Sequence, residues 1–197
     1  MEKLDMLTDE QLVKMYAQGN NEAFDVLLSR HQSKVFSYIC FVVHNRDVAD
    51  DIFQETFVKA IVTIQQGRYV ESGKFVAWLI RIAHNLIIDY FRQERNANLI
   101  SNDDSEVDLF NDEKLSDPNI EMQIVSEQTL DDVKLLMEHL PANQREVVYM
   151  RYYQELSFKE IAEITGVSIN TALGRMRYAL LNLRRMATKR HLCLETA

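Results

Sequence analysis

The stretch from Lys74 to Arg95 constrains the fold more strongly than any other part of this 197-residue chain. Apolar side chains recur in it at the three- and four-residue steps of an α-helix, and neither Gly nor Pro interrupts them. They form one stripe, namely Phe75, Trp78, Leu79, Ile82, Ala83, Leu86 and Tyr90. The spacing predicts a long amphipathic helix with one face in a core.

A second stripe on the same predicted helix is polar and cationic. It comprises Lys74, Arg81, Asn85, Arg92 and Arg95, which fall near one angle of the helical wheel. Guanidinium and ammonium groups match phosphate, and an Asn side chain can form paired hydrogen bonds with the edge of a base. The stripe is a candidate nucleic-acid surface, and the alternative is an ordinary solvated basic face.

The composition favours a helical protein whose charge is unevenly distributed. The chain is 47% hydrophobic, has only five Gly and two Pro, and carries a net charge of −8. Residues 101–135 hold 2 basic against 11 acidic side chains, whereas residues 136–197 hold 9 against 6. An acidic middle and a basic C-terminal third indicate three segments of different character.

Several classes of protein are disfavoured by what the sequence lacks. The longest apolar runs are too short to span a bilayer, and the N-terminus has no signal-peptide pattern. Cys40 and Cys193 have neither redox nor metal-ligand spacing, which favours a cytoplasmic protein. The five His residues are scattered, and no nucleophile and base stand at motif spacing. We therefore expect no enzyme activity, no metal and no cofactor.

The N-terminal hundred residues are expected to form a compact all-α bundle. A capping box at Thr8 to Gln11 opens a short helix that Gly19 and Asn20 end. Asn21 is the expected N-cap of a second helix, and Asp47 is the expected start of a third, which runs to about Gln65. A loop over residues 66–73 then leads into the central helix.

The third helix carries a surface that looks like a docking site. Its expected core stripe is Val48, Ile52, Phe53, Phe57, Ala60, Ile61 and Ile64. Beside this stripe lie five polar residues, Asp47, Asp50, Asp51, Gln54 and Glu55, with Val58 and Val62 also pointing away from the core. Carboxylates beside exposed valines favour a basic partner surface, and the alternative is helix-start acids that the macrodipole stabilises.

The segment from Ser101 to Asp117 is polar, acidic and aperiodic, which predicts a flexible linker. Helical periodicity returns by about Ile124, and Pro141 separates that helix from the next. The helix after Pro141 is expected to be held by Val147, Val148, Met150 and Tyr153.

A helix-turn-helix is predicted next. A second capping box, Ser157 to Glu160, opens a short helix that ends at Thr165, Gly166 makes the turn, and Ser168 caps a last helix to about Arg185. Its expected core residues are Ile161, Ala162, Val167, Ala172, Met176, Leu180 and Leu183. The opposite face offers Asn170, Thr171, Gly174, Arg175 and Tyr178 to a major groove. The alternative is two packed helices that do not bind DNA.

Two blocks of the sequence resemble regions of bacterial sigma factors. DVADDIFQETFVKA followed by KFVAWLIRIAHNLIIDYFRQER resembles region 2, and LPANQREVVYMRYYQELSFKEIAEITGVSINTALGRMRYALLNLRR resembles region 4. With only those regions and a short linker, the chain is similar to the extracytoplasmic-function (ECF) group. The resemblance implies a region-2 domain over residues 1–98, a linker over 99–123, a region-4 domain over 124–190 and a tail over 191–197.

The resemblance also implies partners and roles. A transcription initiation factor of this kind binds core RNA polymerase and promoter DNA, and an anti-sigma factor often silences it. Docking on the clamp helices of the largest polymerase subunit would use the acidic face of the third helix, namely Asp47, Asp50, Asp51, Gln54 and Glu55. The minus-ten element would meet Arg68, Lys74, Arg81, Asn85, Arg92 and Arg95. The minus-thirty-five element would meet Ser168, Asn170, Thr171, Gly174, Arg175, Arg177 and Tyr178. Leu173 departs from the family, which often has Lys or Arg at that position.

One alternative function is a dimeric helix-turn-helix regulator that binds an operator. Such a protein needs a two-fold interface and two half-sites one DNA turn apart. Nothing in the sequence resembles an effector pocket or a coiled-coil seam, and the acidic face of the third helix would have no role.

Overall fold

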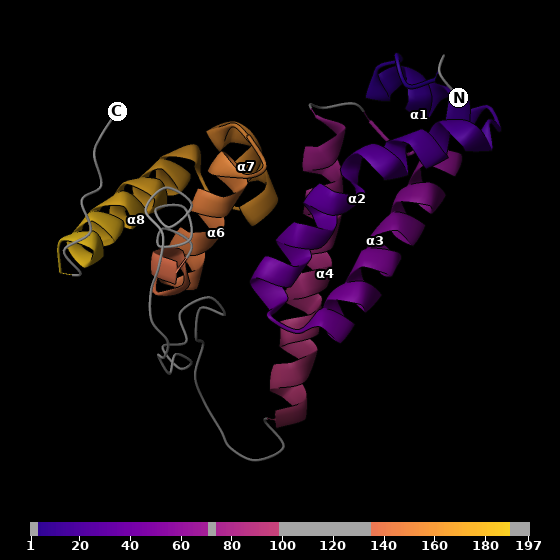
Figure 1. Ribbon diagram of the computed structural model, residues 1–197. Helices are drawn as coiled ribbons and strands as arrows, with labels where there is room; N and C mark the ends of the chain where they lie inside the picture. Colours follow the sequence, from indigo (N-terminus) through magenta and orange to yellow (C-terminus); the bar gives the residue numbers. More distant parts are fainter. Residues whose placement is uncertain (1–3, 71–73, 99–134, 190–197) are drawn as a thin grey trace, which may run out of the picture. The chain divides into compact units, whose positions relative to one another are not determined.

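The computed structural model describes residues 4–70, 74–98 and 135–189 (Figure 1). The chain divides into two compact units, unit 1 over Met1–Asn102 and unit 2 over Asp103–Ala197. Both are built from α-helices, which confirms the all-α prediction of two small helical domains. The predicted acidic linker, the expected return of helical periodicity at Ile124 and the predicted C-terminal tail lie outside the described residues.

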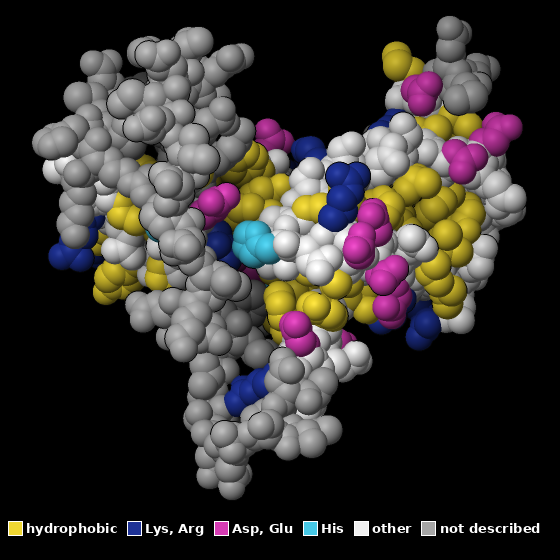
Figure 2. All heavy atoms as spheres, turned by 60° about the horizontal axis from the view of Figure 1, so that its bottom comes forward, with side chains coloured by type: hydrophobic (Ala, Val, Ile, Leu, Met, Phe, Trp, Pro, Cys, Tyr) yellow, Lys and Arg dark blue, Asp and Glu magenta, His cyan; other side chains and the backbone are white. Residues whose placement is uncertain are grey.

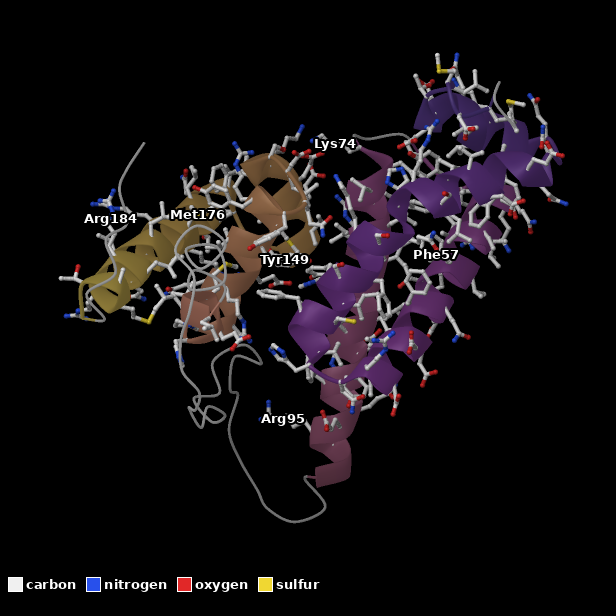
Figure 3. All side chains as sticks on the ribbon, in the orientation of Figure 1. Phe57, Lys74, Arg95, Tyr149, Met176 and Arg184 are labelled. Carbon is white, nitrogen blue, oxygen red and sulfur yellow. The ribbon has the colours of Figure 1, made fainter. Side chains whose placement is uncertain are left out.

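Unit 1 is a bundle of four helices. Its members are α1 (Asp9–Ala17), α2 (Asn21–Val43), α3 (Arg46–Gln65) and α4 (Phe75–Asn98). Helix α2 packs against each of the other three, and α3 packs against α4 and α1. The core therefore lies where α2, α3 and α4 meet, and Phe57 of α3 is among its buried side chains (Figure 3).

The helix caps of unit 1 confirm one prediction and correct two. At α1, the Thr8 hydroxyl accepts from the Gln11 backbone N–H and the Gln11 side chain accepts from the Thr8 N–H, as the capping box predicts. Helix α2 is capped by Asn20, not Asn21, and α3 begins at Arg46 rather than Asp47, with Asn45 as its cap. An N-cap needs an extended backbone, and residue type alone cannot tell which of two neighbouring polar residues adopts it.

The buried face of α4 is centred differently from the predicted stripe. Phe75, Leu79, Ala83 and Leu86 are buried as expected, while Trp78, Ile82 and Tyr90 are only partly covered. The remaining buried positions are Val76, Ala77, Ile80, His84 and Ile87. Because α2 and α3 both pack on this helix, its buried arc is wider than one stripe and is rotated away from Trp78.

A polar cluster ties α1 to α2. Arg30 Nη1 donates to Asp9 Oδ1 at 2.9 Å, and His31 Nε2 lies 2.8 Å from Asp9 Oδ2. The hydrogen bond from His31 is the largest cause of a pKa of Asp9 below its ordinary value; the Arg30 guanidinium adds to this effect, and burial opposes it. The His31 ring also contacts Phe75 at the start of α4, with ring centroids 5.5 Å apart.

Unit 2 contains α6 (Ala142–Tyr152), α7 (Phe158–Thr165) and α8 (Ile169–Lys189), and α8 packs against both of the others. The Ser157–Glu160 capping box is present, and Gly166 has φ +67, as the helix-turn-helix prediction requires. The Ser168 hydroxyl accepts from the Thr171 backbone N–H at 3.1 Å, which caps α8. A side-chain hydrogen bond of 2.9 Å joins Asn182 of α8 to Gln144 of α6.

Two expected core residues of unit 2 are on its surface. Tyr153 is 40% exposed and Leu180 is 42% exposed. Tyr149, one turn before Tyr153, is buried in its place, and Ala179, one residue before Leu180, is buried in place of the leucine. Helix α8 also continues one turn beyond the predicted end at Arg185. Met176 lies on its packed side and Arg184 on its exposed side (Figure 3).

Candidate nucleic-acid and partner interfaces

A groove of about 450 Å³ runs between α3 and α4 of unit 1. Helix α3 contributes Val58, Lys59, Val62 and Thr63, the connection after it contributes Arg68, and α4 contributes Trp78, Ile82 and Asn85. Val58 and Val62 are 57% and 39% exposed, so the apolar wall of the groove is open to solvent. Apolar walls with a few polar groups at the rim are typical of ligand sites of this size.

Trp78, which lines the groove, belongs to an aromatic cluster. Trp78 packs against Tyr69, with ring centroids 4.7 Å apart, and against Phe75, at 5.5 Å. Tyr69 in turn contacts Phe75 at 5.9 Å. The indole of Trp78 is therefore fixed on two sides while part of it lines the groove, which leaves an aromatic surface available for stacking.

Two of the six residues predicted for the minus-ten element, Arg68 and Asn85, come together in this groove, and both are exposed. Of the other four, Lys74 lies directly before α4, and Arg81, Arg92 and Arg95 lie along it; Figure 3 labels Lys74 and Arg95. Arg92 is exposed and donates to Asp89 at 3.3 Å, whereas Arg81 is half-buried. The cationic stripe thus runs past the groove rather than lying wholly within it.

The groove includes residues that the sequence pattern did not single out. Trp78 and Ile82 were assigned to the core, and Val58 and Val62 to a partner-docking face. On the helical wheel, Trp78 and Ile82 form the edge of the apolar stripe that adjoins the cationic stripe, and this border position could have indicated a shared role. The pairing of this border with the valines of α3 required the packing of the two helices.

The acidic residues of α3 lie on the surface as predicted. Asp47, Asp51, Gln54 and Glu55 are exposed and Asp50 is half-buried. Glu55 forms an ion pair of 3.0 Å with Lys59 one turn later, so its charge is partly compensated. Figure 2 shows acidic side chains in a row on one face of unit 1, beside hydrophobic ones. The exposed side of α3 therefore changes from acidic in its first half to apolar at Val58 and Val62.

The predicted reading face of α8 is largely accessible. Asn170, Arg177 and Tyr178 are exposed, and Gly174 and Arg175 are half-exposed. The Ser168 and Thr171 hydroxyls lie 2.8 Å apart and are both exposed, although Ser168 also serves as the cap. Ala172, Met176, Ala179 and Leu183 are buried on the opposite side. The first turns of α8 are therefore accessible enough to enter the major groove of DNA, while the other side of the helix packs in the core of unit 2.

Two further findings concern metal sites and membrane-spanning helices. Within residues 4–70, 74–98 and 135–189, no three His, Cys, Asp or Glu side chains are grouped as a metal site requires. None of the described helices has the length and apolar content needed to cross a membrane.

Family models match both halves of the chain. The model of sigma-70 region 2 matches residues 27–97, and the model of sigma-70 region 4 matches residues 130–183. The first range contains α3, the groove and all of α4 but its last residue, and the second contains α7, the turn and α8 as far as Leu183.

Curated relatives cover most of the chain. The ECF RNA polymerase sigma-E factor of Haemophilus influenzae is 30% identical over 176 residues, which are 87% of this chain and 91% of the relative. The protein of the same name from Escherichia coli K12 is 32% identical over 177 residues, with 87% and 90% covered. The RNA polymerase sigma factor CarQ of Myxococcus xanthus is 26% identical, with 88% and 94% covered.

Solved structures share the fold. The sigma factor RpoE of Bartonella quintana, solved with the anti-sigma factor NepR, superposes with a TM-score of 0.62 at 22% identity, with 84% of this chain and 96% of that chain covered. CnrH in complex with the cytosolic domain of CnrY gives a TM-score of 0.62 at 24% identity, with 92% and 97% covered. With both regions matched and 30–32% identity over nearly the whole length, this chain belongs to the ECF group of RNA polymerase sigma factors, a family of transcription initiation factors.

Proposed function

We propose that unit 1 docks on core RNA polymerase through the acidic face of α3 and takes one strand of the opened minus-ten element into the groove between α3 and α4. Unit 2 then reads the minus-thirty-five element with the first turns of α8. The observation that carries this proposal is the groove itself, which combines Trp78, Asn85 and Arg68 on unit 1.

The lining of the groove suits a single strand better than a duplex. An unpaired base has a free π-face that stacks on aromatic side chains, whereas paired bases are covered by their neighbours in the duplex. Trp78 offers such a surface, and it is the only Trp in the chain. Asn85 can recognise the edge of a base, and Arg68 and Lys59 can contact phosphates.

The acidic face of α3 suits a basic protein surface. Asp47, Asp51 and Gln54 are exposed on successive turns, and carboxylates so arranged favour and orient an oppositely charged partner. The proposed partner is the pair of clamp helices of the largest polymerase subunit. Because the valines after this face line the groove, one helix would connect polymerase docking to promoter opening.

The charge of the chain explains why a partner is needed. Operator-binding proteins that act alone commonly contact about six to ten phosphates. Residues 136–197 have only three more basic than acidic side chains, and the whole chain has a net charge of −8. Attachment to polymerase would hold both units near the same promoter, which raises their effective concentration without further contacts.

The proposed regulation by an anti-sigma factor is supported by two of the structurally similar proteins. The structures of Bartonella quintana RpoE and of CnrH contain NepR and CnrY, respectively. We propose that a protein of this kind holds the present chain inactive in the bacterial cytoplasm. The matches to both sigma regions do not favour a dimeric operator-binding regulator.

The experiment combines the full chain with sigma-free core polymerase. We expect a one-to-one complex that gives run-off transcripts from a subset of genomic fragments. Asp51→Lys should weaken the complex at least about tenfold, because it places a cation against a basic partner. Asp25→Lys on α2 is the matched control, since it makes the same charge change at another exposed position.

Two outcomes would contradict the proposal. One is the absence of a one-to-one complex with core polymerase under low-salt conditions. The other is an equal loss of binding for Asp51→Lys and Asp25→Lys, which would mean that overall charge and not the face of α3 governs association.

A further inference from the structure

Leu173 is an exposed apolar residue on the reading helix. It lies in the second turn of α8 and is 44% exposed. Asn170 is one turn before it and Arg177 one turn after it, and both are exposed polar residues. Side chains three and four positions apart are neighbours on a helix surface, so Leu173 belongs to the same accessible strip as these two. It is not covered by the core of unit 2.

The surface beside Leu173 is open. Gly174 follows it, and an ideal Cβ placed on Gly174 would meet nothing within 4 Å. No other side chain of the described unit therefore occupies the position of a Cβ at Gly174, and the absence of a side chain there lets another molecule approach the helix backbone closely. The side chain of Leu173 extends further from the helix than the bare backbone at Gly174. It can therefore reach deeper into a major groove than that backbone can.

The chemistry of the major groove contains one apolar group, the 5-methyl group of thymine. Leucine can neither donate nor accept a hydrogen bond, so it gains nothing from the donor and acceptor edges of a G·C pair. Its approach to such a pair would instead remove water from those polar groups without replacing the hydrogen bonds. A thymine methyl is therefore the DNA group that an exposed leucine at this position favours.

We infer that Leu173 is a specificity-determining residue of the upstream element and that it contacts the methyl group of a thymine. This inference rests on the proposed role of α8 in reading the minus-thirty-five element. It assigns an apolar contact to a strip in which Asn170 and Arg177 would act through hydrogen bonds and charge.

Leu180 provides a matched control within the same helix. It is the same residue type and is 42% exposed, but it lies seven positions further along α8. At 1.5 Å per residue it is about 10 Å from Leu173 along the helix axis, too far along to share the groove contact of the first two turns. A general apolar surface for a protein partner would include both leucines, whereas a thymine contact would involve Leu173 alone.

The test uses the full chain bound to core polymerase at one fixed salt concentration. The upstream element is first selected from random duplexes by this wild-type complex. Each thymine in it is then replaced singly by deoxyuridine, which removes only the methyl group. We expect one position at which deoxyuridine weakens binding about fourfold, the factor expected for one buried methyl group.

Three variants assign that effect to Leu173. Leu173→Ala should weaken binding to the thymine duplex and make the complex indifferent to deoxyuridine at that position. Leu173→Met keeps an apolar contact of similar reach and should retain most of the sensitivity. Leu180→Ala should keep the full wild-type sensitivity.

Several results would overturn the inference. They are a selected element with no methyl-sensitive thymine, a sensitivity that persists in Leu173→Ala, or an equal, methyl-independent loss in Leu173→Ala and Leu180→Ala. If the wild-type complex selects no upstream element at all, the proposed function fails with it. A selected element that is indifferent to methyl groups defeats the Leu173 inference alone.

Discussion

Helices α4 and α8 are the two candidate DNA-contacting helices, and they present different surfaces. Helix α4 contributes Trp78, Ile82 and Asn85 to a groove whose other wall is α3. Helix α8 offers its own first turns, in which Asn170 and Leu173 are exposed. A walled aromatic groove fits a base that has left the stack, whereas a projecting helix end fits the open edge of paired bases. The difference fits the proposed division of roles, in which unit 1 opens the promoter and unit 2 reads the duplex.

The two units also differ in how their helices are tied together. In unit 1, Asp9 bonds to Arg30 and His31 and fixes α1 on α2. In unit 2, the neutral side chains of Gln144 and Asn182 join α6 to α8. A carboxylate changes charge in acid and an amide does not. The stabilisation by the Asp9 contacts should therefore depend on pH, and that by the Gln144–Asn182 hydrogen bond should not.

The largest expected effect tests the division between opening and reading. Trp78→Ala should reduce open-complex formation on a duplex promoter by about 1–3 kcal/mol, the usual cost of losing one base-stacking contact. The reduction caused by Trp78→Ala should be smaller on a template whose minus-ten segment is already unpaired. Arg175→Ala should cost about 1–3 kcal/mol equally on both templates. Run-off transcription from the two templates measures this.

Trp78→Phe is the control for this comparison, because it keeps an aromatic surface in the groove and should retain much of the activity. If Trp78→Ala and Arg175→Ala respond identically to the pre-opened template, the two helices do not have separate roles.

The next effect concerns the tie between α1 and α2. Asp9→Asn should lower the free energy of unfolding of unit 1 by about 1 kcal/mol at pH 7, because a charge-assisted contact is lost. The pKa of Asp9 is lowered in the folded state, so its contribution is complete above the unfolded pKa of about 4 and is lost as the pH falls through the folded pKa. The variant and the wild type should therefore converge in acid.

Denaturant titrations at pH 7, 5 and 3 measure this convergence. Gln144→Ala in unit 2 is the control, and its cost should not change with pH because neither partner titrates. A difference between Asp9→Asn and wild type that stays constant down to pH 3 would show that Asp9 acts only through packing.

The smallest effect compares one backbone position in each unit. His44, which ends α2, and Glu155, between α6 and α7, both have φ +56. A Cβ disfavours this conformation and Gly does not, so His44→Gly and Glu155→Gly should each stabilise their unit by about 0.5 kcal/mol. Thermal unfolding measures the change. His44→Ala and Glu155→Ala keep the Cβ and should give no gain, and a gain equal to that of Gly would contradict the explanation.

The sequence by itself determined the all-α class, both capping boxes, the turn at Gly166 and the exposed acidic face of α3. These features depend on contacts within about four residues, such as the Ser157–Glu160 pair, and local spacing reveals them. The helix-turn-helix and its accessible residues Asn170 and Tyr178 followed from the same short-range rules.

Only the tertiary structure decided which faces are covered. Leu180 and Tyr153 have the periodicity of core residues, yet none of the described helices covers them. Val76 and Ile80, in contrast, are buried because α2 and α3 both pack on α4. The groove is of this kind too, since Val62 and Trp78 are 16 positions apart and become neighbours only when α3 lies along α4. Periodicity shows that a helix has an apolar side, but the width and direction of the buried arc depend on how many neighbours pack against it.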